Sequence, residues 1–360
     1  MKFFFVAFYT FLTFNSFSQS FKGKVLDENK IPLSGAILYY EGTTISTISD
    51  ENGKFSLEYN PKENNTLVIS FLGYQTQYFT NNDYFSSLDS DRNLNIYLRI
   101  SGIPLKEVVI NRKDKFSRKQ KLEIFRKEFL GKTRNANAAI IKNEEDIYFK
   151  YDKTKFVLKA FSDKPLMIEN RSLGYKIYYE LINFEVTFSK LSVFNNDILL
   201  SSYKGLSRFE EIENSLQILT NREKAYRGSQ IHFFSTLANN SWSKEQFLLA
   251  NNKEKVYAND CFKIYREENF IKVELIKQLK KNKNENFVAS YDVIFDEQEQ
   301  TNIIFETNSF TVDKNGNNSN IENIIFTGAM SEKRVGDMLP LNYNSIPEKT
   351  SSITKFQKGI

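Results

Sequence analysis

Short apolar runs and clusters of turn-forming residues alternate over the first hundred positions of the chain. Leu94, Ile96 and Leu98 are spaced two residues apart, which is typical of a strand with one buried face. Residues 50–53 read Asp-Glu-Asn-Gly and predict a tight hairpin turn, because Gly53 can adopt the positive φ that such turns require. About seven strands at a spacing of roughly 8–12 residues predict a β-sandwich. The runs assigned to strands are 21–26, 36–40, 44–49, 55–58, 66–71, 74–79 and 94–98.

A pattern with helical spacing follows at 112–134. Leu122, Phe125 and Phe129 recur at helical offsets, and Gly131 is a natural stop. We expect a basic linker that is helical from about 115 to 130. Its excess of Lys and Arg allows two interpretations: a surface for anionic lipid, or a helix that docks by its apolar stripe while its charges are solvated. We favour the second, since runs of charge usually only solvate a face.

Residues 135–345 return to strand patterns and predict a larger β-rich α+β region. The aromatic stretch 174–188 predicts either a hairpin or one strand with a bulge. A single helix is expected within 220–239, where several residues fall on helical offsets. The Lys- and Asn-rich segments 280–284 and 314–318 are expected to be hairpin loops.

The N-terminal residues predict export. Lys2 precedes an almost unbroken apolar run at 3–14, and the Ser-Phe-Ser at 16–18 offers small residues to a signal peptidase. We expect residues 1–18 to be a signal peptide that is removed before Gln19. An uncleaved anchor is the alternative, although the run is shorter than the ~20 apolar residues of a spanning helix. No cysteine lies directly after the run, so a lipoprotein is not supported.

No later stretch of the sequence reaches spanning length, so we expect no transmembrane helix after signal cleavage. The expected location is the periplasm, or the outer membrane and cell surface, with peripheral membrane association as an option. Residues 346–360 are expected to be a C-terminal tail.

The net charge and the cysteine count argue against a nucleic-acid partner and exclude an internal disulfide. The 360-residue chain has a formal charge of +5, which becomes +4 without Lys2 and does not favour nucleic acid as a partner. Cys261 is the single cysteine and cannot form an internal disulfide. We expect it to be a small buried hydrophobe rather than a reactive thiol, and we expect packing to stabilise the protein.

Several spaced motifs of the first domain closely resemble the carboxypeptidase regulatory-like domain of Bacteroidota envelope proteins, over about residues 20–110. The resemblance implies a transthyretin-like β-sandwich, a module that often precedes the plug of outer-membrane receptors. The motifs are Gly23-Lys24-Val25, Pro32-Leu33-Ser34-Gly35-Ala36, Gly42-Thr43, Thr47-Ile48-Ser49-Asp50, Asn52-Gly53-Lys54-Phe55, Ile69-Ser70-Phe71-Leu72-Gly73-Tyr74 and Leu105-Lys106-Glu107-Val108-Val109-Ile110.

The fold class that we predict is therefore mainly β. It comprises an N-terminal transthyretin-like β-sandwich (19–111), the linker helix (112–134) and the larger β-rich α+β region (135–345). That larger region resembles the uncharacterised C-terminal part of envelope proteins with this module, which implies architecture and compartment only. The segments that carry this second resemblance include 129–131, 168–175, 225–229 and 328–330.

The carboxypeptidase name does not extend to catalysis. A metallocarboxypeptidase zinc site needs two histidines and a glutamate, whereas His232 is the only histidine here. Residues 50–53 lack the spaced acidic ligands of a calcium loop. We therefore expect no metal and no cofactor, and no phosphate-loop or dinucleotide motif is present.

A Ser-His-Asp triad is arithmetically possible, with Ser229 or Ser235 as the nucleophile for His232. Hydroxyls three residues away on a helix more often bond to backbone groups, and Gly228-Ser229 lacks the second glycine of a nucleophile elbow. We favour a structural His232 and a protein that is not an enzyme. Carboxylate pairs from distant strands leave a hydrolase of unrecognised type as an alternative; the local acidic group at 210–213 is interpreted as a solvated face.

A small set of charged and aromatic residues remains as candidates for binding a ligand or bracing two elements. An Arg-Asp pair is expected to act as a brace more often than as an anion site. We carry three functions: binding of a protein, glycan or lipid partner in the envelope; a structural accessory of an outer-membrane system; or the hydrolase. The candidate residues are Arg222, Tyr226, Arg227, His232, Arg334 and Asp337.

Overall fold

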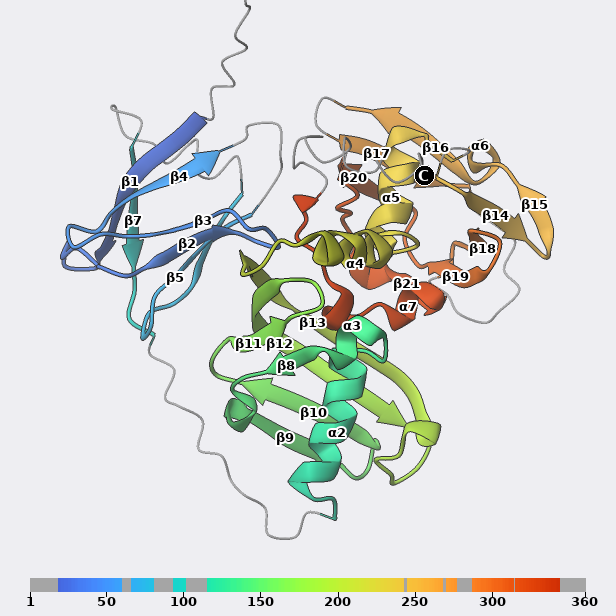
Figure 1. Cartoon of the computed structure of the whole chain (residues 1–360), viewed down its shortest axis with the longest axis horizontal. Coiled ribbons are helices and arrows are strands. Elements are labelled where there is room, and N and C mark those ends of the chain that lie inside the picture. The colour runs from blue at the N-terminus through green and yellow to red at the C-terminus, as the bar shows by residue number, and fades with distance from the viewer. Residues whose placement is uncertain are drawn as a thin grey trace, which may run out of the picture.

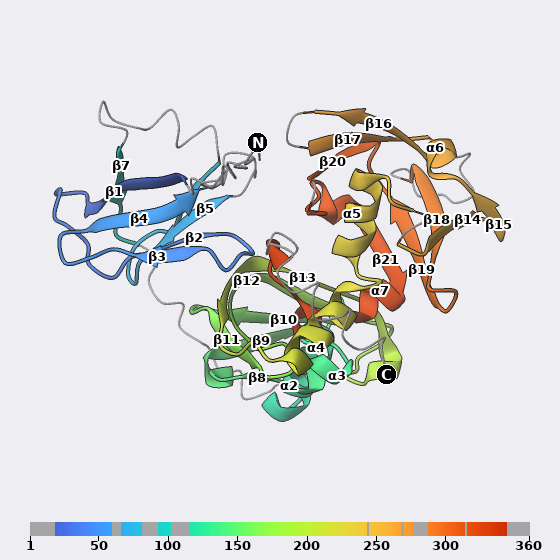
Figure 2. The ribbon, with the colours of Figure 1, turned by 45° about the horizontal axis from the view of Figure 1, so that its top comes forward.

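The computed structural model describes residues 19–59, 66–80, 93–101, 115–242, 245–267, 270–276, 287–313 and 315–343. These residues fold around three hydrophobic cores, visible in Figures 1 and 2 as three bodies: a sandwich at the left, a helix-backed sheet at the bottom and a second β-rich body at the right. We call them the sandwich, the central body and the distal body. The predicted signal peptide (1–18) and the tail (346–360) lie outside the described residues.

The sandwich confirms the fold predicted for the first domain. One sheet has the order β4-β1-β7 and the other β3-β2-β5-β6, and every pairing is antiparallel except that of β1 with β7. Apolar side chains from both sheets, Val25, Leu38 and Ile96 among them, are fully buried between the sheets. The strands are β1 (Gln19–Asp27), β2 (Ile37–Tyr40), β3 (Ser46–Ile48), β4 (Lys54–Tyr59), β5 (Leu67–Ser70), β6 (Gln77–Phe79) and β7 (Asn93–Leu98).

The turn at residues 50–53 forms, but it does not close a hairpin. Gly53 has φ +70° and the Asp50 carboxylate accepts hydrogen bonds from the backbone of Asn52 and Lys54. The strands on either side belong to different sheets, because β3 pairs with β2 and β4 pairs with β1. The prediction of a hairpin was therefore wrong: local turn chemistry gives the turn but not the partner of each strand.

The central body is a six-stranded sheet with a helix on one face (Figure 1). Its strands follow the order β8-β11-β12-β10-β9, with β13 along the other side of β12. The stretch at 174–188 is one strand with a bulge between Leu181 and Asn183, the second of the two predicted forms. The strands are β8 (Ala139–Ile141), β9 (Ile147–Asp152), β10 (Val157–Ser162), β11 (Leu166–Asn170), β12 (Tyr175–Phe188) and β13 (Ile198–Glu211).

The helix of the predicted linker is α2 (Arg118–Phe129), and it belongs to the central body. Ser117 and Gln120 form a capping box at its start. Phe125 and Phe129 are fully buried, with ring centres 4.7 Å from Phe184 and 5.0 Å from Tyr179 respectively. The apolar stripe thus docks on the sheet, as in the interpretation that we favoured.

Two helices replace the single helix expected at 220–239. α4 (Leu216–Tyr226) ends at Arg227, and α5 (Gln230–Asn239) begins after Ser229, whose hydroxyl caps its N-terminus. Gly228 lies between them with φ +67°. The helical spacing of the apolar residues continues across this break, so the spacing alone did not show it. Gly228 is typical of the end of a helix and Ser229 of the start of the next one.

The distal body has its own core, so residues 135–345 contain two cores rather than one. α5 inserts Phe233, Phe234 and Leu237 into this core, beneath the sheets β15-β14-β18-β19-β21 and β16-β17-β20. The elements are β14 (Phe247–Asn251), β15 (Glu254–Val256), α6 (Ala258–Cys261), β16 (Phe262–Arg266), β17 (Phe270–Leu275), β18 (Ala289–Phe295), β19 (Glu299–Phe305), β20 (Ser309–Asp313), β21 (Ile324–Gly328) and α7 (Ala329–Glu332).

The loop expected at 280–284 lies outside the described residues, whereas the one at 314–318 is partly described. After β20 the chain turns back sharply, with a bridge between Val312 and Asn318. The next strand, β21, then pairs with β19 in the other sheet. The predicted hairpin was wrong: β20 and β21 do not pair, because β21 forms its hydrogen bonds with β19.

The chain ends its described path by returning to the central body. Val335 and Leu339 are buried in the central core, around the short helix η4 (Val335–Asp337) and near α3 (Arg134–Asn137). Among the described residues, no helix is long and apolar enough to cross a membrane.

Candidate functional site

Five of the six predicted residues lie where the central and distal bodies meet, whereas Arg222 contacts the central body. Arg222 and Tyr226 lie on α4, Arg227 follows it, and His232 lies on α5. Arg334 and Asp337 lie on the returning segment around η4. The sequence named these residues as candidates for binding or bracing, but it gave no sign that five of them meet at one junction.

Arg222 is a buried brace. Its side chain is 0% exposed and donates to the carbonyls of Leu173 (2.7 Å) and Glu213 (2.9 Å). It also pairs with the Glu211 carboxylate at 2.8 Å and stacks 3.9 Å from the centre of the Tyr175 ring. The planar guanidinium thus forms hydrogen bonds along its edge and stacks on Tyr175 with its face. These contacts connect α4 to the turn before β12.

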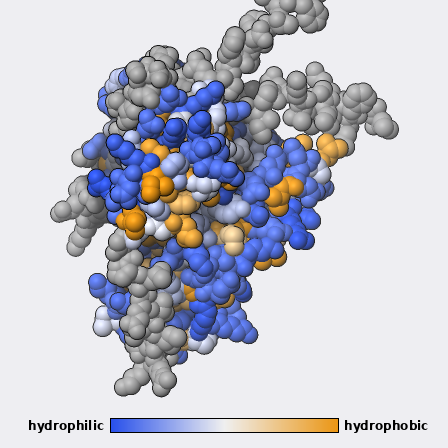
Figure 3. Space-filling model, turned by 90° about the vertical axis from the view of Figure 1, so that its left-hand side faces the viewer, coloured by the Kyte–Doolittle hydropathy of each residue, from blue (hydrophilic) through white to orange (hydrophobic). Residues whose placement is uncertain are grey.

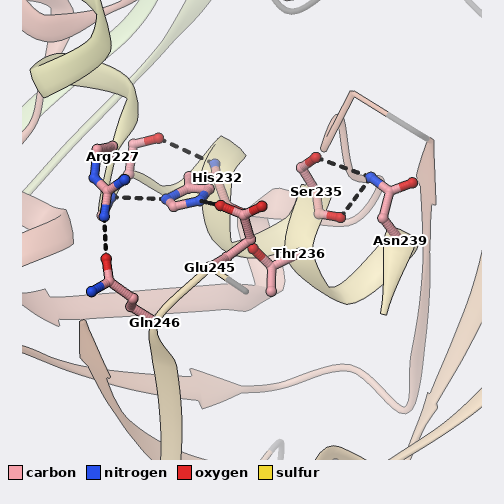
Figure 4. Close-up of polar contacts among 9 residues, drawn as sticks. Arg227, His232, Ser235, Thr236, Asn239, Glu245 and Gln246 are labelled. Carbon is pink, nitrogen blue, oxygen red and sulfur yellow. Dashed lines mark hydrogen bonds and ion pairs between the residues drawn. The ribbon is translucent and has the colours of Figure 1, made fainter. Parts of the chain in front are cut away.

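His232 makes polar contacts through both ring nitrogens, and Figure 4 shows the one with Glu245. Its Nδ1 accepts a hydrogen bond from the Gly228 N–H at 3.0 Å, so Nε2 carries the proton and donates to Glu245 at 3.2 Å. The ring is 2% exposed. Burial lowers the pKa of His232, Glu245 opposes this shift, and the charges of Arg227 and Lys333 add to it. Both ring nitrogens are occupied, as expected of a structural histidine.

The serines considered as nucleophiles bond elsewhere. The Ser229 hydroxyl accepts from the His232 backbone N–H at 3.2 Å, as a helix cap. The Ser235 hydroxyl, one helical turn after His232 on α5, accepts a hydrogen bond from the Asn239 side chain at 3.2 Å (Figure 4). Neither contacts a ring nitrogen of His232, so the geometry offers no serine–histidine pair here.

Arg334 and Asp337 do not pair with each other through their side chains. Arg334 contacts the Glu128 carboxylate at 3.1 Å and donates to its carbonyl and to the Ser201 hydroxyl. Asp337 accepts from Thr133 at 2.6 Å and from Asn135 at 2.9 Å. The expected Arg-Asp brace is thus replaced by two braces, each from η4 to the region of α2 and α3.

Lys333 is a largely buried cation beside these residues that the sequence analysis missed. Its ammonium group donates to the Arg227 carbonyl and lies 4.0 Å from Glu299. Burial lowers the pKa of Lys333, and burial also raises the pKa of Asp337. The analysis also missed Glu128. A single acidic residue within the apolar stripe of a basic helix could have indicated a buried partner for a cation.

A cavity of about 150 Å³ lies beside Lys333, Arg334 and Asp337, with Tyr203, Tyr226 and Tyr343 among its walls. Burial raises the pKa of Tyr203 and of Tyr343 to about 12, so both phenols stay neutral. The polar groups described above already have protein partners. The site is thus a braced junction of the two bodies, and it is small for an organic ligand.

The acidic group at 210–213 does not converge. Glu210 accepts from the Tyr178 hydroxyl at 3.0 Å, whereas Glu211 pairs with Arg222. Within the described ranges there is no group of three His, Cys, Asp or Glu side chains placed to hold a metal ion.

The sandwich joins the same junction through the turn after β2. The Gly42 N–H donates to the Ser207 carbonyl at 2.6 Å, and the Phe209 N–H donates to the Thr43 carbonyl at 3.0 Å. This turn therefore extends the free edge of β13. On its other side, Leu341 donates to the Gly42 carbonyl at 2.8 Å, which clamps the turn against the C-terminal segment.

The fold and site define a class: a two-sheet β-sandwich module clamped to a larger β-rich part through backbone hydrogen bonds. Residues 21–110 match the family model of the CarboxypepD_reg-like domain, so the first domain belongs to this family, as its motifs predicted. The chain is also 41% identical over 69 residues to the TonB-dependent receptor SusC of Bacteroides thetaiotaomicron. That match covers 19% of this chain and 7% of the receptor's length.

A chain in a crystal structure of a type II cohesin–X-dockerin complex from Acetivibrio cellulolyticus is 19% identical to this protein. The match covers 24% of this chain and 60% of that chain, with a TM-score of 0.20. Similarity at this level carries no functional information.

Proposed function

We propose that the protein is a non-catalytic binding or accessory protein of a bacterial cell envelope, exported to the periplasm or outer membrane. The CarboxypepD_reg-like match carries this proposal, together with the sequence similarity to a TonB-dependent receptor. In this proposal the sandwich docks onto an envelope membrane protein, while the larger part holds a ligand or a second partner.

The geometry of the sandwich supports docking. Its β2–β3 turn is engaged internally, which fixes the sandwich against the central body. Leu72 is 90% exposed and Ile100 is 65% exposed, and the Ser101 N–H donates to the Gly73 carbonyl between their segments. Apolar side chains appear among hydrophilic ones on the face toward the viewer in Figure 3. Exposed apolar groups of this kind favour protein contacts.

The test is purification of the tagged, full-length protein from its native envelope after crosslinking, followed by mass spectrometry. We expect one membrane protein in near-stoichiometric yield. The double variant Leu72→Asp/Ile100→Asp is expected to lower its recovery about 10-fold, because charged side chains weaken an apolar contact.

The matched control is Ile48→Asp. Ile48 is 64% exposed and lies on β3, at the opposite edge of the sheet from β6. This variant should recover the partner as the wild type does. Thermal melting of each variant checks that it is folded, and a wild-type protein that recovers no specific membrane protein would overturn the proposal.

A further inference from the structure

The distal body contains a second, larger cavity, of about 440 Å³. It lies between the segment after α5, the start of β14, the β15–α6 connection and the β18–β19 turn. Small-molecule sites typically measure about 300–1,000 Å³. This cavity is therefore large enough for an organic ligand, unlike the braced cavity at the junction.

Part of the lining of the cavity is apolar and aromatic. Phe247 and Leu249 are buried, and Trp242 lies beside them. Tyr257 is 68% exposed at the rim, next to Val256. The Lys255 ammonium group lies 5.6 Å from the centre of the Tyr257 ring. An exposed aromatic ring at the rim of a partly apolar cavity suits a ligand with an apolar face.

The lining also includes polar residues, with more negative than positive charge. Asp296 and Glu297 provide two carboxylates, whereas Lys255 provides one ammonium group. Asn240 and Asn259 add amides, which can both donate and accept hydrogen bonds. Carboxylates only accept hydrogen bonds when ionised, so these residues suit hydroxyl donors and disfavour anionic ligands.

The rim is held in an unusual backbone conformation. Asn240, Gln246, Asp296 and Glu297 have φ values of +52°, +61°, +49° and +60°. Positive φ is unfavourable for residues with a side chain, and turns of this kind prefer Asn-Gly or Asp-Gly. The Gln246 amide donates to Asp296 at 3.1 Å, and the Asp296 N–H donates to the Gln246 carbonyl at 3.2 Å. Asn240 is the left-handed cap that ends α5, and Asp296 and Glu297 form the turn between β18 and β19, so these conformations fix the rim as parts of the fold.

We propose that this cavity binds a neutral saccharide of one or two sugar units. The apolar face of the sugar packs on Tyr257 and the cavity wall, and its hydroxyl groups bond to Glu297, Asp296 and the amides of the rim. The inference rests on the proposed function, since it names the ligand class of a non-catalytic binding protein.

Trp242 makes the test direct. It is the single tryptophan of the chain and lines the cavity, so fluorescence excited at the tryptophan band reports on this site. The full-length protein is titrated with a panel of neutral sugars (glucose, galactose, N-acetylglucosamine, cellobiose and lactose), with glucose 6-phosphate as the anionic counterpart of glucose. We expect a saturable change with at least one neutral sugar, and at least about 10-fold weaker binding of glucose 6-phosphate than of glucose.

Variants separate the site from the fold. Tyr257→Ala should weaken binding of the selected sugar at least about 10-fold, and Glu297→Gln about 5-fold. Tyr265→Ala is the control: Tyr265 is a 46% exposed tyrosine of β16, in the same body but outside the cavity. Equal affinities for all three variants would overturn the inference, as would the absence of a saturable signal for every neutral sugar.

This outcome is independent of the docking test. If the partner is recovered while no neutral sugar binds, the saccharide inference fails and the proposed docking function stands. If sugar binds and no partner is recovered, the docking proposal fails instead.

Discussion

The Gly42 N–H and the Ser207 carbonyl are joined by a 2.6 Å hydrogen bond, and this bond attaches the sandwich to the edge of the central sheet. Gly42 has φ +73°, and a Cβ placed on it would lie 2.6 Å from Cδ1 of Leu341. The position therefore requires glycine for two reasons, its conformation and its close contact with the clamping segment.

The first prediction uses Gly42→Ala. The left-handed conformation should cost about 1–2 kcal/mol, and the clash with Leu341 should add to this and open the clamp. Amide hydrogen exchange should then become at least about 10-fold faster at Phe209 and Leu341, whose N–H groups bond to the turn.

Gly73→Ala is its matched control. Gly73 has φ +86°, but no atom lies within 4 Å of an added Cβ. It should show the conformational cost without faster exchange at Phe209 and Leu341. Equal exchange at these two amides in both variants would show that the turn does not clamp the sandwich.

The second prediction concerns Arg222. Lysine at this position cannot reach the Leu173 and Glu213 carbonyls and the Glu211 carboxylate together, so it leaves buried acceptors unsatisfied. Arg222→Lys should lower the free energy of unfolding by about 3–5 kcal/mol in urea titrations. Glu211→Gln, at a side chain that is 39% exposed, should cost about 1 kcal/mol or less. A loss below about 1 kcal/mol for Arg222→Lys would contradict the bracing role.

The third prediction concerns pH and His232. Burial keeps the pKa of His232 below its ordinary value, so between the unfolded and folded pKa values the unfolded chain binds more protons than the folded one. His232 should therefore lower stability as pH falls from about 6.5. His232→Asn retains an acceptor for the Gly228 N–H and removes this titration.

The measurement is the difference in unfolding free energy between wild type and His232→Asn from pH 7 to pH 5. Burial raises the pKa of Glu41 and of Glu180, so these groups act in the opposite direction, and they cancel in the difference. The wild type should lose stability relative to the variant as pH falls. A difference that does not change with pH would show that His232 titrates normally.

The fourth prediction concerns Cys261. The side chain is 1% exposed, and burial raises its pKa to about 11, so the thiolate is scarce and inaccessible at neutral pH. A thiol reagent should label the native protein only as fast as it unfolds. A Cys261→Ala/Leu72→Cys variant moves the thiol to a 90% exposed site and should react at once. Equally fast labelling of the native wild type would contradict the buried, inert role.

Local patterns in the sequence determined most of the individual elements. Period-two alternation identified β7, the uncharged run identified β5, and the apolar stripe identified α2 within a few residues of its observed ends. These predictions succeeded because burial of one face selects the spacing of apolar residues. The motifs of the first domain also predicted its family, which the match at residues 21–110 confirms.

The candidate site was predicted as residue types and not as partners. Arg334 was expected to pair with Asp337 three residues away, but it contacts Glu128 from the distant helix α2. Lys333 had no visible role in sequence, because its acceptor is a backbone carbonyl at the end of α4. Contacts of this kind depend on which segments meet in space, and no local pattern encodes them.

The sequence by itself determined a mainly β chain, its sandwich, the amphipathic α2 and the buried character of Cys261, since each follows from spacing, turn chemistry or side-chain type. The tertiary structure alone decided the division of 135–345 into two cores, the break at Gly228, the sheet that β21 joins and the clamp on Gly42. The physical reason is that strand partners and cores are chosen by competition among distant segments for the same buried surface and backbone hydrogen bonds.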